Sequence, residues 1–151
     1  MNQSCERWGE GDVHIIAQSL GGAVAIPAIA LLENHCIKSL VVDSSFLSYR
    51  QVARKKFSQF FLTWPFQYPL SFLVSDHFSP MYFLKKIKLP LLYFHSEKDQ
   101  VVPFSQGKAL FDFYPYSKKK IMVVKETGHC QAFAMKKNDY KVETLNFLKS
   151  L

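Results

Sequence analysis

Four short apolar runs, rich in β-branched and aromatic residues, recur along the chain and predict β-strands. They lie at Val13–Ala17, Ile37–Asp43, Leu89–His95 and Ile121–Val124. Between and after them, apolar residues recur at helical spacing. The predicted helices cover Leu20–Glu33, Ser105–Tyr114 and Asn138–Leu151. Because strands alternate with helices, we predict an α/β fold with a mostly parallel sheet and flanking helices.

The pattern changes between the second and third runs. From Phe57 to Ser75 no residue is charged, aromatic residues are frequent, and Pro65 and Pro69 interrupt the segment. Its length approaches that of a membrane span, but the prolines and the polar positions argue against one. We therefore predict a single domain, residues 1–151, with residues 46–86 as a helical lid that covers the end of the first strand. Its aromatic side chains form either a lid or acyl pocket or ordinary core packing.

The first strand ends at Ser19, which has small residues two positions before and after it, Ala17 and Gly21. This spacing is typical of a nucleophile elbow, a strained turn from strand to helix. We expect the neighbours to be small because the strand and the helix approach closely there. The Ser19 hydroxyl would then project from the carboxyl end of the sheet, with the Leu20 amide pointing at a developing oxyanion. An ordinary serine in a glycine-rich connection has the same pattern, so other residues must show whether Ser19 is a nucleophile.

A serine hydroxyl becomes a nucleophile when a base takes its proton and a carboxylate fixes the tautomer of that base. Asp99 and His129 follow the third and fourth strands, so they are expected at the same edge of the sheet as Ser19. Asp43, at the end of the second strand, is an alternative acid. The chain order Ser, Asp, His is that of α/β hydrolases.

Over nearly its whole length the chain resembles the α/β-hydrolase family, in particular its serine-aminopeptidase-like, monoacylglycerol-lipase-like and dienelactone-hydrolase-like esterases. The matching segments are Gln18–Gly22, Leu89–Leu92, Lys98–Pro103 and Gly128–His129. The resemblance implies that Ser19 is the nucleophile, Asp99 the acid and His129 the base. It also implies a serine hydrolase that cleaves carboxylic esters, lipid-like ones included, through an acyl-serine intermediate and without a metal or cofactor.

The resemblance covers only the C-terminal part of the family's fold. The family has about four more strands before the elbow strand, and a loop among them supplies the second oxyanion amide, a donor typically worth about 10²–10³ in kcat. A catalytically weak or inactive remnant that at most binds a ligand is therefore the alternative function. The strand Val13–Ala17, apolar on both faces, would also be an unpaired edge, through which we expect self-association.

Other reactive side chains have weaker patterns. Cys130 lies next to His129, but no elbow surrounds it, and a free cysteine is usually inert packing. We expect His95 to be structural. The remaining histidines lack partners at a readable spacing and are expected on the surface or in the core: His14, His35 and His77. The three cysteines, odd in number and without a metal-binding spacing, indicate neither a disulfide framework nor a zinc site.

The chain is basic, with a formal net charge of +7. Its lysine and arginine clusters lie between the predicted elements, and no groove-reading module accompanies them. We therefore expect no nucleic-acid partner, and attraction to anionic membrane surfaces or acidic substrates instead. The first residues lack the pattern of a signal peptide, so we predict a cytoplasmic location.

Overall fold

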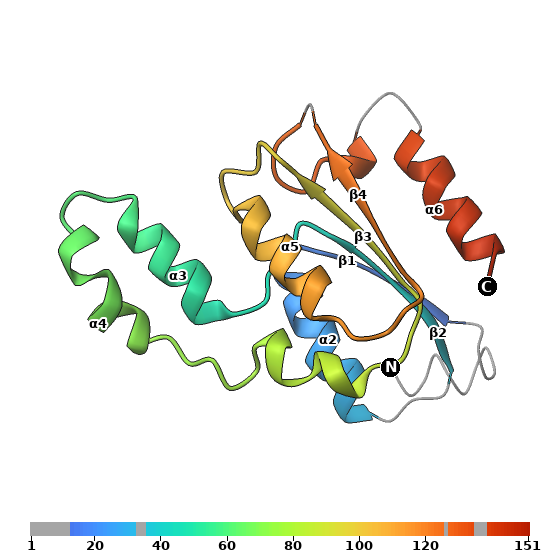
Figure 1. Cartoon of the computed structure of the whole chain (residues 1–151), viewed down its shortest axis with the longest axis horizontal. Helices are drawn as coiled ribbons and strands as arrows, with labels where there is room; N and C mark the ends of the chain where they lie inside the picture. Colours follow the sequence, from blue (N-terminus) through green and yellow to red (C-terminus); the bar gives the residue numbers. More distant parts are fainter. Residues whose placement is uncertain (1–12, 33–35, 126, 135–138) are drawn as a thin grey trace.

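The computed structural model describes residues 13–32, 36–125, 127–134 and 139–151 (Figure 1). Its strands form one parallel sheet in the order β1-β2-β3-β4, with bounds Val13–Gln18, Ile37–Asp43, Leu91–Ser96 and Lys119–Val124. Parallel neighbours need crossover connections, and helices supply them here. These flanking helices are α2 (Leu20–Leu32), α5 (Phe104–Phe113) and α6 (Asp139–Lys149). The predicted α/β fold with a parallel sheet and flanking helices is confirmed.

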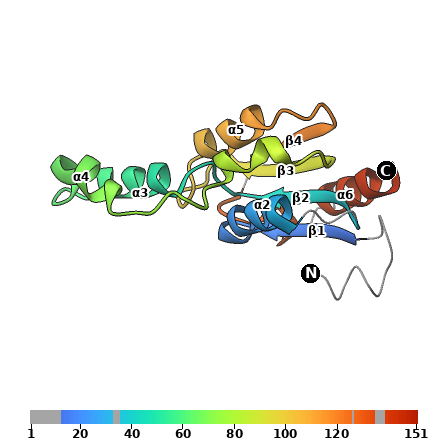
Figure 2. The same ribbon diagram turned by 90° about the horizontal axis from the view of Figure 1, so that it is seen from below.

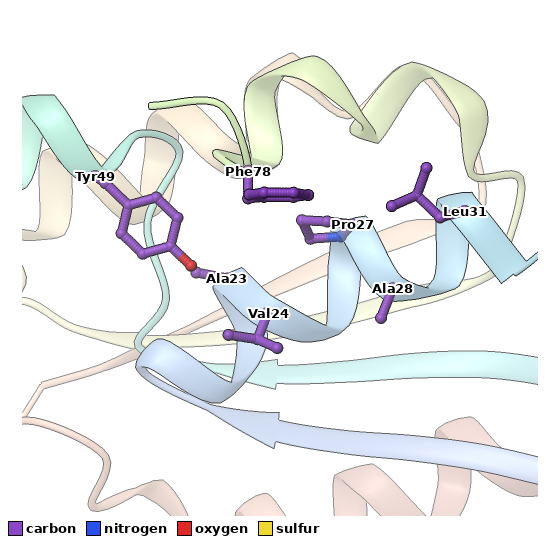
Figure 3. Close-up of a pocket in the computed structure, with 7 residues that line it drawn as sticks. All are labelled: Ala23, Val24, Pro27, Ala28, Leu31, Tyr49 and Phe78. Atoms are coloured by element: carbon purple, nitrogen blue, oxygen red, sulfur yellow. The ribbon is translucent and has the colours of Figure 1, made fainter. Parts of the chain in front are cut away.

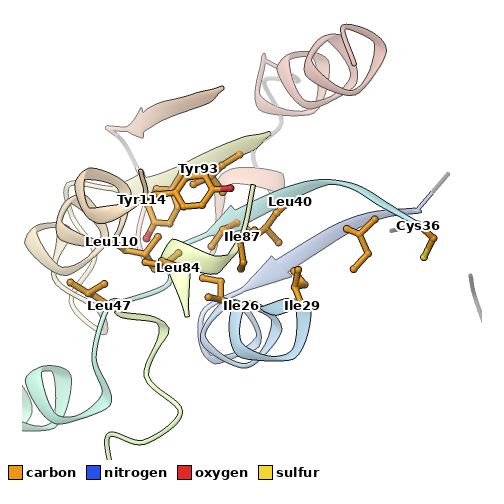
Figure 4. Close-up of a cluster of buried hydrophobic side chains, with 13 residues drawn as sticks. Ile26, Ile29, Cys36, Leu40, Leu47, Leu84, Ile87, Tyr93, Leu110 and Tyr114 are labelled. Atoms are coloured by element: carbon orange, nitrogen blue, oxygen red, sulfur yellow. The ribbon is translucent and has the colours of Figure 1, made fainter. Parts of the chain in front are cut away.

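Both faces of the sheet are covered, because successive side chains of a strand point to opposite sides. On one face, Ile26 of α2 and Leu110 of α5 join Tyr93 in the main cluster of buried side chains (Figure 4). On the other face, Phe94 packs in a second cluster that includes Phe147 of α6. This layering fixes the carboxyl ends of the four strands along one edge.

The segment between β2 and β3 is helical, as predicted, and its role as a lid stays a prediction. Its helices, α3 (Tyr49–Ser58) and α4 (Gln67–Phe72), extend away from the sheet (Figures 1 and 2). The highly basic α3 has no fully buried residue, and its apolar residues Tyr49 and Val52 pack, partly buried, against the cluster that contains Phe46. The ends of the segment belong to the core instead, since Leu47 and Leu84 are buried in the main cluster. Within the described ranges, no helix is long and apolar enough to cross a membrane.

The buried carboxylate of Asp76 holds the base of this helical segment together. The Ser48 hydroxyl lies 2.9 Å from both carboxylate oxygens, the Arg50 amide donates over 3.1 Å, and the Ser79 hydroxyl donates as well. Ser48 also caps α3 by accepting from the Gln51 amide at 3.2 Å. Burial opposes ionisation, but the hydrogen bonds and the charge of Arg50 outweigh it and hold the pKa of Asp76 below its ordinary value.

Replacing Asp76 with asparagine should lower the free energy of unfolding by about 1–2 kcal/mol near neutral pH, because an amide leaves at least one donor without its acceptor. A lowered carboxyl pKa stabilises the fold above the ordinary value of about 4, and this contribution disappears as the pH falls through the folded pKa. The difference between wild type and Asp76→Asn should therefore shrink below about pH 4, measured by urea unfolding.

The matched control is Asp112→Asn, which removes a carboxylate from a half-exposed pair with Lys108. It should change stability by less than about 0.5 kcal/mol. An Asp76→Asn protein as stable as wild type at neutral pH would contradict the expected result.

One cysteine forms a disulfide bond, which the sequence had not indicated. Cys36, just before β2, is disulfide-bonded, and its partner lies outside the described residues. The odd cysteine count had indicated no disulfide framework, but an odd number still leaves room for one bond and one free thiol. The predicted cytoplasmic location, which rested partly on that count, stays a prediction without this support.

Candidate active site

The turn between β1 and α2 has the strained geometry of an elbow. Ser19 has a φ of +50°, in the left-handed region that costs a non-glycine residue about 1–3 kcal/mol. Its amide donates to the Asp43 carbonyl over 2.8 Å, and its carbonyl accepts from the Gly22 amide over 3.0 Å. The neighbouring strand and the first helical turn thus hold Ser19 at the carboxyl edge of the sheet.

Gly22, and not Gly21, is the glycine that this turn requires. A Cβ at Gly22 would lie 2.8 Å from the Ser45 Cβ and 3.0 Å from the Val42 Cγ1. A Cβ at Gly21 would meet no atom within 4 Å. A methyl group therefore fits at position 21, and the expectation that a side chain larger than a methyl would clash there stays a prediction.

Two loops bring Asp99 and His129 to Ser19. The Ser19 Oγ lies 2.7 Å from the His129 Nε2, and the His129 Nδ1 lies 2.7 Å from the Asp99 Oδ2. With the proton assigned to Nδ1, the ring donates to the carboxylate and accepts from the serine hydroxyl. The three predicted site residues therefore form one hydrogen-bonded chain.

Asp99 is held by its own loop. Its Oδ1 accepts from the amides of Val101 and Val102, each at 2.8 Å. The fully buried His95 supports the same loop: its Nε2 donates to the Val102 carbonyl over 2.9 Å and lies 3.4 Å from the Asp99 Oδ2. Burial lowers the pKa of His95 despite the opposing Val102 hydrogen bond and Asp99 charge, so the ring is neutral at pH 7.

The alternative acid, Asp43, has different partners. Its carboxylate accepts from the side-chain amide of Gln18 at 3.1 Å and from the Ser44 hydroxyl at 2.9 Å. Burial raises the pKa of Asp43, although those two hydrogen bonds partly offset the effect. Because His129 is paired with Asp99, the geometry favours Asp99 as the acid.

Cys130 lies beside this chain but holds its proton. Its amide donates to the Ser44 hydroxyl over 3.2 Å, and its Sγ lies 3.8 Å from the Asp43 carbonyl oxygen. Burial, reinforced by the charges of Asp43 and Asp99, raises the pKa of the Cys130 thiol to about 11. Since the thiolate is the reactive form, this thiol is a weak nucleophile at neutral pH.

Iodoacetamide should therefore alkylate Cys130 slowly near pH 8, where about one thiol in a thousand is ionised. The rate should rise about tenfold per pH unit up to about pH 10, because only the thiolate reacts. Mass spectrometry of the modified peptide measures this rate, with a short cysteine peptide as the reference thiol. A rate that levels off near pH 8 would contradict the raised pKa.

The remaining predicted groups fall in separate places. Leu20 opens α2, and its amide has no hydrogen-bond acceptor within the described residues, as is usual in a first helical turn. The second oxyanion amide that the resemblance implies would precede β1, outside the described residues. His14 bonds to the buried Ser39 hydroxyl at 2.7 Å, His77 lies in a shallow hollow near Asp76, and His35 lies outside the described residues.

An apolar hollow of about 400 Å³ runs along the outer face of α2 (Figure 3). It begins at Ala23, one helical turn after Ser19. Its lining residues come from α2, from the start of α3 and from the segment after α4: Ala23, Val24, Pro27, Ala28, Leu31, Tyr49 and Phe78. Sequence reasoning missed this site because α2 is apolar around most of its surface, so no position stands out in the pattern.

Comparison with known proteins identifies the fold. No protein-family model matches the chain. The esterase Pf2001 of Pyrococcus furiosus superposes with a TM-score of 0.66 at 22% identity, over 91% of this chain and 52% of that chain. The α/β hydrolase MGS-MChE2, from a lagoon-sediment metagenome, superposes with a TM-score of 0.67 at 15% identity, over 99% of this chain and 67% of that chain. The chain therefore has the α/β-hydrolase fold.

A sequence relative matches the chain over a similar share of its own length. The uncharacterized protein YfhR of Escherichia coli O157:H7 is 23% identical over 138 residues, which are 90% of this chain and 45% of that protein. The chain thus spans less than half the length of this relative and about half that of Pf2001. The structural neighbours include proteins described as esterases and as a serine hydrolase.

Proposed function

We propose that the protein is a serine hydrolase that cleaves carboxylic esters. Ser19 is the nucleophile, His129 the general base and Asp99 the acid that fixes the His129 tautomer. The observation that carries the proposal is the hydrogen-bonded chain of two 2.7 Å contacts that ends on a serine in a strained elbow. An ordinary surface serine needs neither the strain nor a buried carboxylate behind its histidine.

The reaction follows from these contacts. The Ser19 Oγ attacks the ester carbonyl carbon while its proton moves to the His129 Nε2. The Leu20 amide, at the N-terminus of α2, stabilises the negative charge that develops on the carbonyl oxygen. His129 then returns the proton to the departing alkoxide, which leaves an acyl-Ser19 ester. His129 then takes a proton from water, which attacks the acyl carbon; the bond to Ser19 Oγ breaks, the carboxylic acid leaves, and His129 returns the proton to Oγ.

A fluorophosphonate probe tests the nucleophile, because it phosphonylates only an activated serine. Wild type should be labelled on Ser19, and Ser19→Ala should not. Cys130→Ala is the matched control and should be labelled like wild type, since the protonated thiol plays no part in the reaction. A folded wild-type protein that stays unlabelled, or label that persists in Ser19→Ala, would overturn the proposal.

The apolar hollow makes esters of longer acyl chains the proposed substrates. Its volume lies in the range of small-molecule sites, and its lining is apolar, which suits an alkyl chain. Val24→Trp should fill the hollow and lower kcat/KM for p-nitrophenyl octanoate at least about tenfold relative to the acetate ester. Leu145→Trp, at a similarly exposed position of α6, is the control. Equal loss for both esters would argue against this substrate class.

The second candidate is a catalytically weak remnant that binds an ester-like ligand. It is favoured by the oxyanion site, where the described residues supply one predicted donor, Leu20. Loss of one such donor typically costs about 10²–10³ in kcat. Stoichiometric fluorophosphonate labelling with steady-state turnover favours the enzyme, whereas ligand binding without labelling favours the remnant.

A further inference from the structure

The loop that joins α3 to α4 carries a cluster of exposed apolar side chains, which we call the apolar tip. It consists of Phe60, Phe61, Leu62, Trp64 and Phe66. Phe61 is 89% exposed and Leu62 is 80% exposed, and the other three are more than half exposed. The tip is the part of the chain farthest from the sheet (Figures 1 and 2). Such a contiguous, protruding apolar surface marks an interaction site.

The charge around the tip has one sign. No acidic residue lies between Asp43 and Asp76, whereas α3 carries four basic residues: Arg50, Arg54, Lys55 and Lys56. Lys55 and Lys56 lie in the last turn of α3, directly before the tip. Asp76 is buried and its charge acts on Arg50, near the start of α3, which leaves Arg54, Lys55 and Lys56 as the basic residues of α3 nearest the tip.

The helices α3 and α4 form a helical hairpin, and two contacts fix them to each other. The Arg54 guanidinium lies 4.7 Å from the centre of the Tyr68 ring, and the Arg50 guanidinium lies 5.2 Å from that of Phe72. The Asp76 network anchors the start of α3 at the base. The tip is therefore presented on a preformed support, which lowers the ordering cost of binding.

We propose that the apolar tip inserts into the surface of an anionic lipid bilayer, with the basic end of α3 at the level of the headgroups. Exposed aromatic side chains next to lysine and arginine are the composition of interfacial anchors. The tip protrudes away from the sheet, so it can reach the surface of a bilayer (Figures 1 and 2). A second copy would bring the same positive charge against α3 and be repelled. The proposal does not depend on the activity of Ser19.

Docking in this way would turn the edge of the sheet that carries the candidate active site toward the bilayer. The Lys56 Nζ donates to the Gln100 carbonyl over 2.7 Å, which joins the end of α3 to the loop that holds Asp99. Ser19 would then face substrates delivered from the lipid surface, which agrees with the apolar hollow along α2.

Trp64 provides a direct readout, because the chain has only two tryptophans. In a Trp8→Phe background, Trp64 is the only remaining tryptophan. On addition of vesicles of phosphatidylcholine and phosphatidylglycerol in equal amounts, its emission should shift to the blue, and added salt should weaken the partition. Pure phosphatidylcholine vesicles should bind at least about tenfold more weakly.

Two variants separate the apolar and the charged contributions. Phe61→Ser/Leu62→Ser should lower partition to the mixed vesicles at least about tenfold, since each side chain is exposed and its loss leaves the fold intact. Lys55→Glu should lower partition to the mixed vesicles about tenfold or more and leave the weak binding to phosphatidylcholine unchanged. Leu145→Ser, at a leucine of α6 that is more than half exposed, is the control and should partition like wild type.

Ser19→Ala should partition like wild type, so a failed hydrolase proposal would leave this result unaffected. An unshifted Trp64 emission, or tip variants that partition like wild type, would overturn the proposal. It would also be overturned if the tip variants abolished self-association in sedimentation while wild type ignored vesicles, because the surface would then bind protein.

Discussion

Asparagine in place of Asp99 should lower kcat/KM for a small activated ester by about 10⁴-fold. The Asp99 carboxylate accepts the Nδ1 proton of His129 over 2.7 Å and so leaves Nε2 free to take the serine proton. An amide can present its NH₂ group to Nδ1 instead, which moves the ring proton to Nε2 and removes the base. Initial rates with p-nitrophenyl acetate measure the loss. Thermal unfolding should change little, because the remaining oxygen can still accept from the Val101 and Val102 amides.

Asp43→Asn is the matched control, since Asp43 is also buried at the end of a strand near the site. Its hydrogen bonds go to Gln18 and Ser44, so its loss should lower kcat/KM by less than about tenfold. If Asp43→Asn lowered kcat/KM as much as Asp99→Asn, Asp43 would again be a candidate for the acid.

The strands and the candidate triad could be predicted because their signals are local. The run Ile37–Asp43 has three consecutive apolar residues at its centre, as is typical of a strand covered on both faces, and β2 has those bounds. Ser19, Asp99 and His129 each follow a strand, and a parallel sheet collects such positions along one edge. The geometry that brings them within 2.7 Å depends on loops, which the pattern could not supply.

The helical segment between β2 and β3 shows where the pattern is ambiguous. A stretch of uncharged aromatic residues has the same composition as a lid, a pocket wall, core packing or a membrane anchor. Its direction depends on the buried Asp76 network and on two arginine–ring contacts, none of which has a sequence period. The helices themselves were expected, whereas the role of the segment as a lid stays a prediction.

The edge of the sheet leaves one sequence prediction open. Within the described residues, β1 pairs only with β2, and Ile16 is more than half exposed. An unpaired apolar edge recruits other strands, so self-association through β1 stays a prediction. Sedimentation at micromolar concentration tests it, and a stable monomer would show that this edge is covered.

Gly107, in α5, lies very close to the His95 and Tyr93 side chains, which the sequence pattern does not indicate. A Cβ at this position would overlap the His95 Nδ1 and lie 2.6 Å from the Tyr93 hydroxyl oxygen. Both side chains are fully buried, and the Tyr93 hydroxyl is fixed by a 2.7 Å hydrogen bond to the Ser45 carbonyl. The added methyl group must therefore displace α5 or the ring that supports the Asp99 loop.

Gly107→Ala should accordingly lower the free energy of unfolding by about 2–4 kcal/mol, measured by urea unfolding. It should also lower kcat by about 10²-fold, because a displaced His95 shifts the Asp99 loop and a misplacement of about 1 Å in a catalytic group can cost that much. Gly21→Ala is the matched control: its Cβ meets no atom, and stability should be unchanged or rise by up to about 1 kcal/mol. In a His95→Ala background the main clash is absent, so Gly107→Ala should cost much less there than in wild type, a coupling that a double-mutant cycle measures. Equal costs in the two backgrounds would show that the close approach of Gly107 to His95 does not determine the stability of this region.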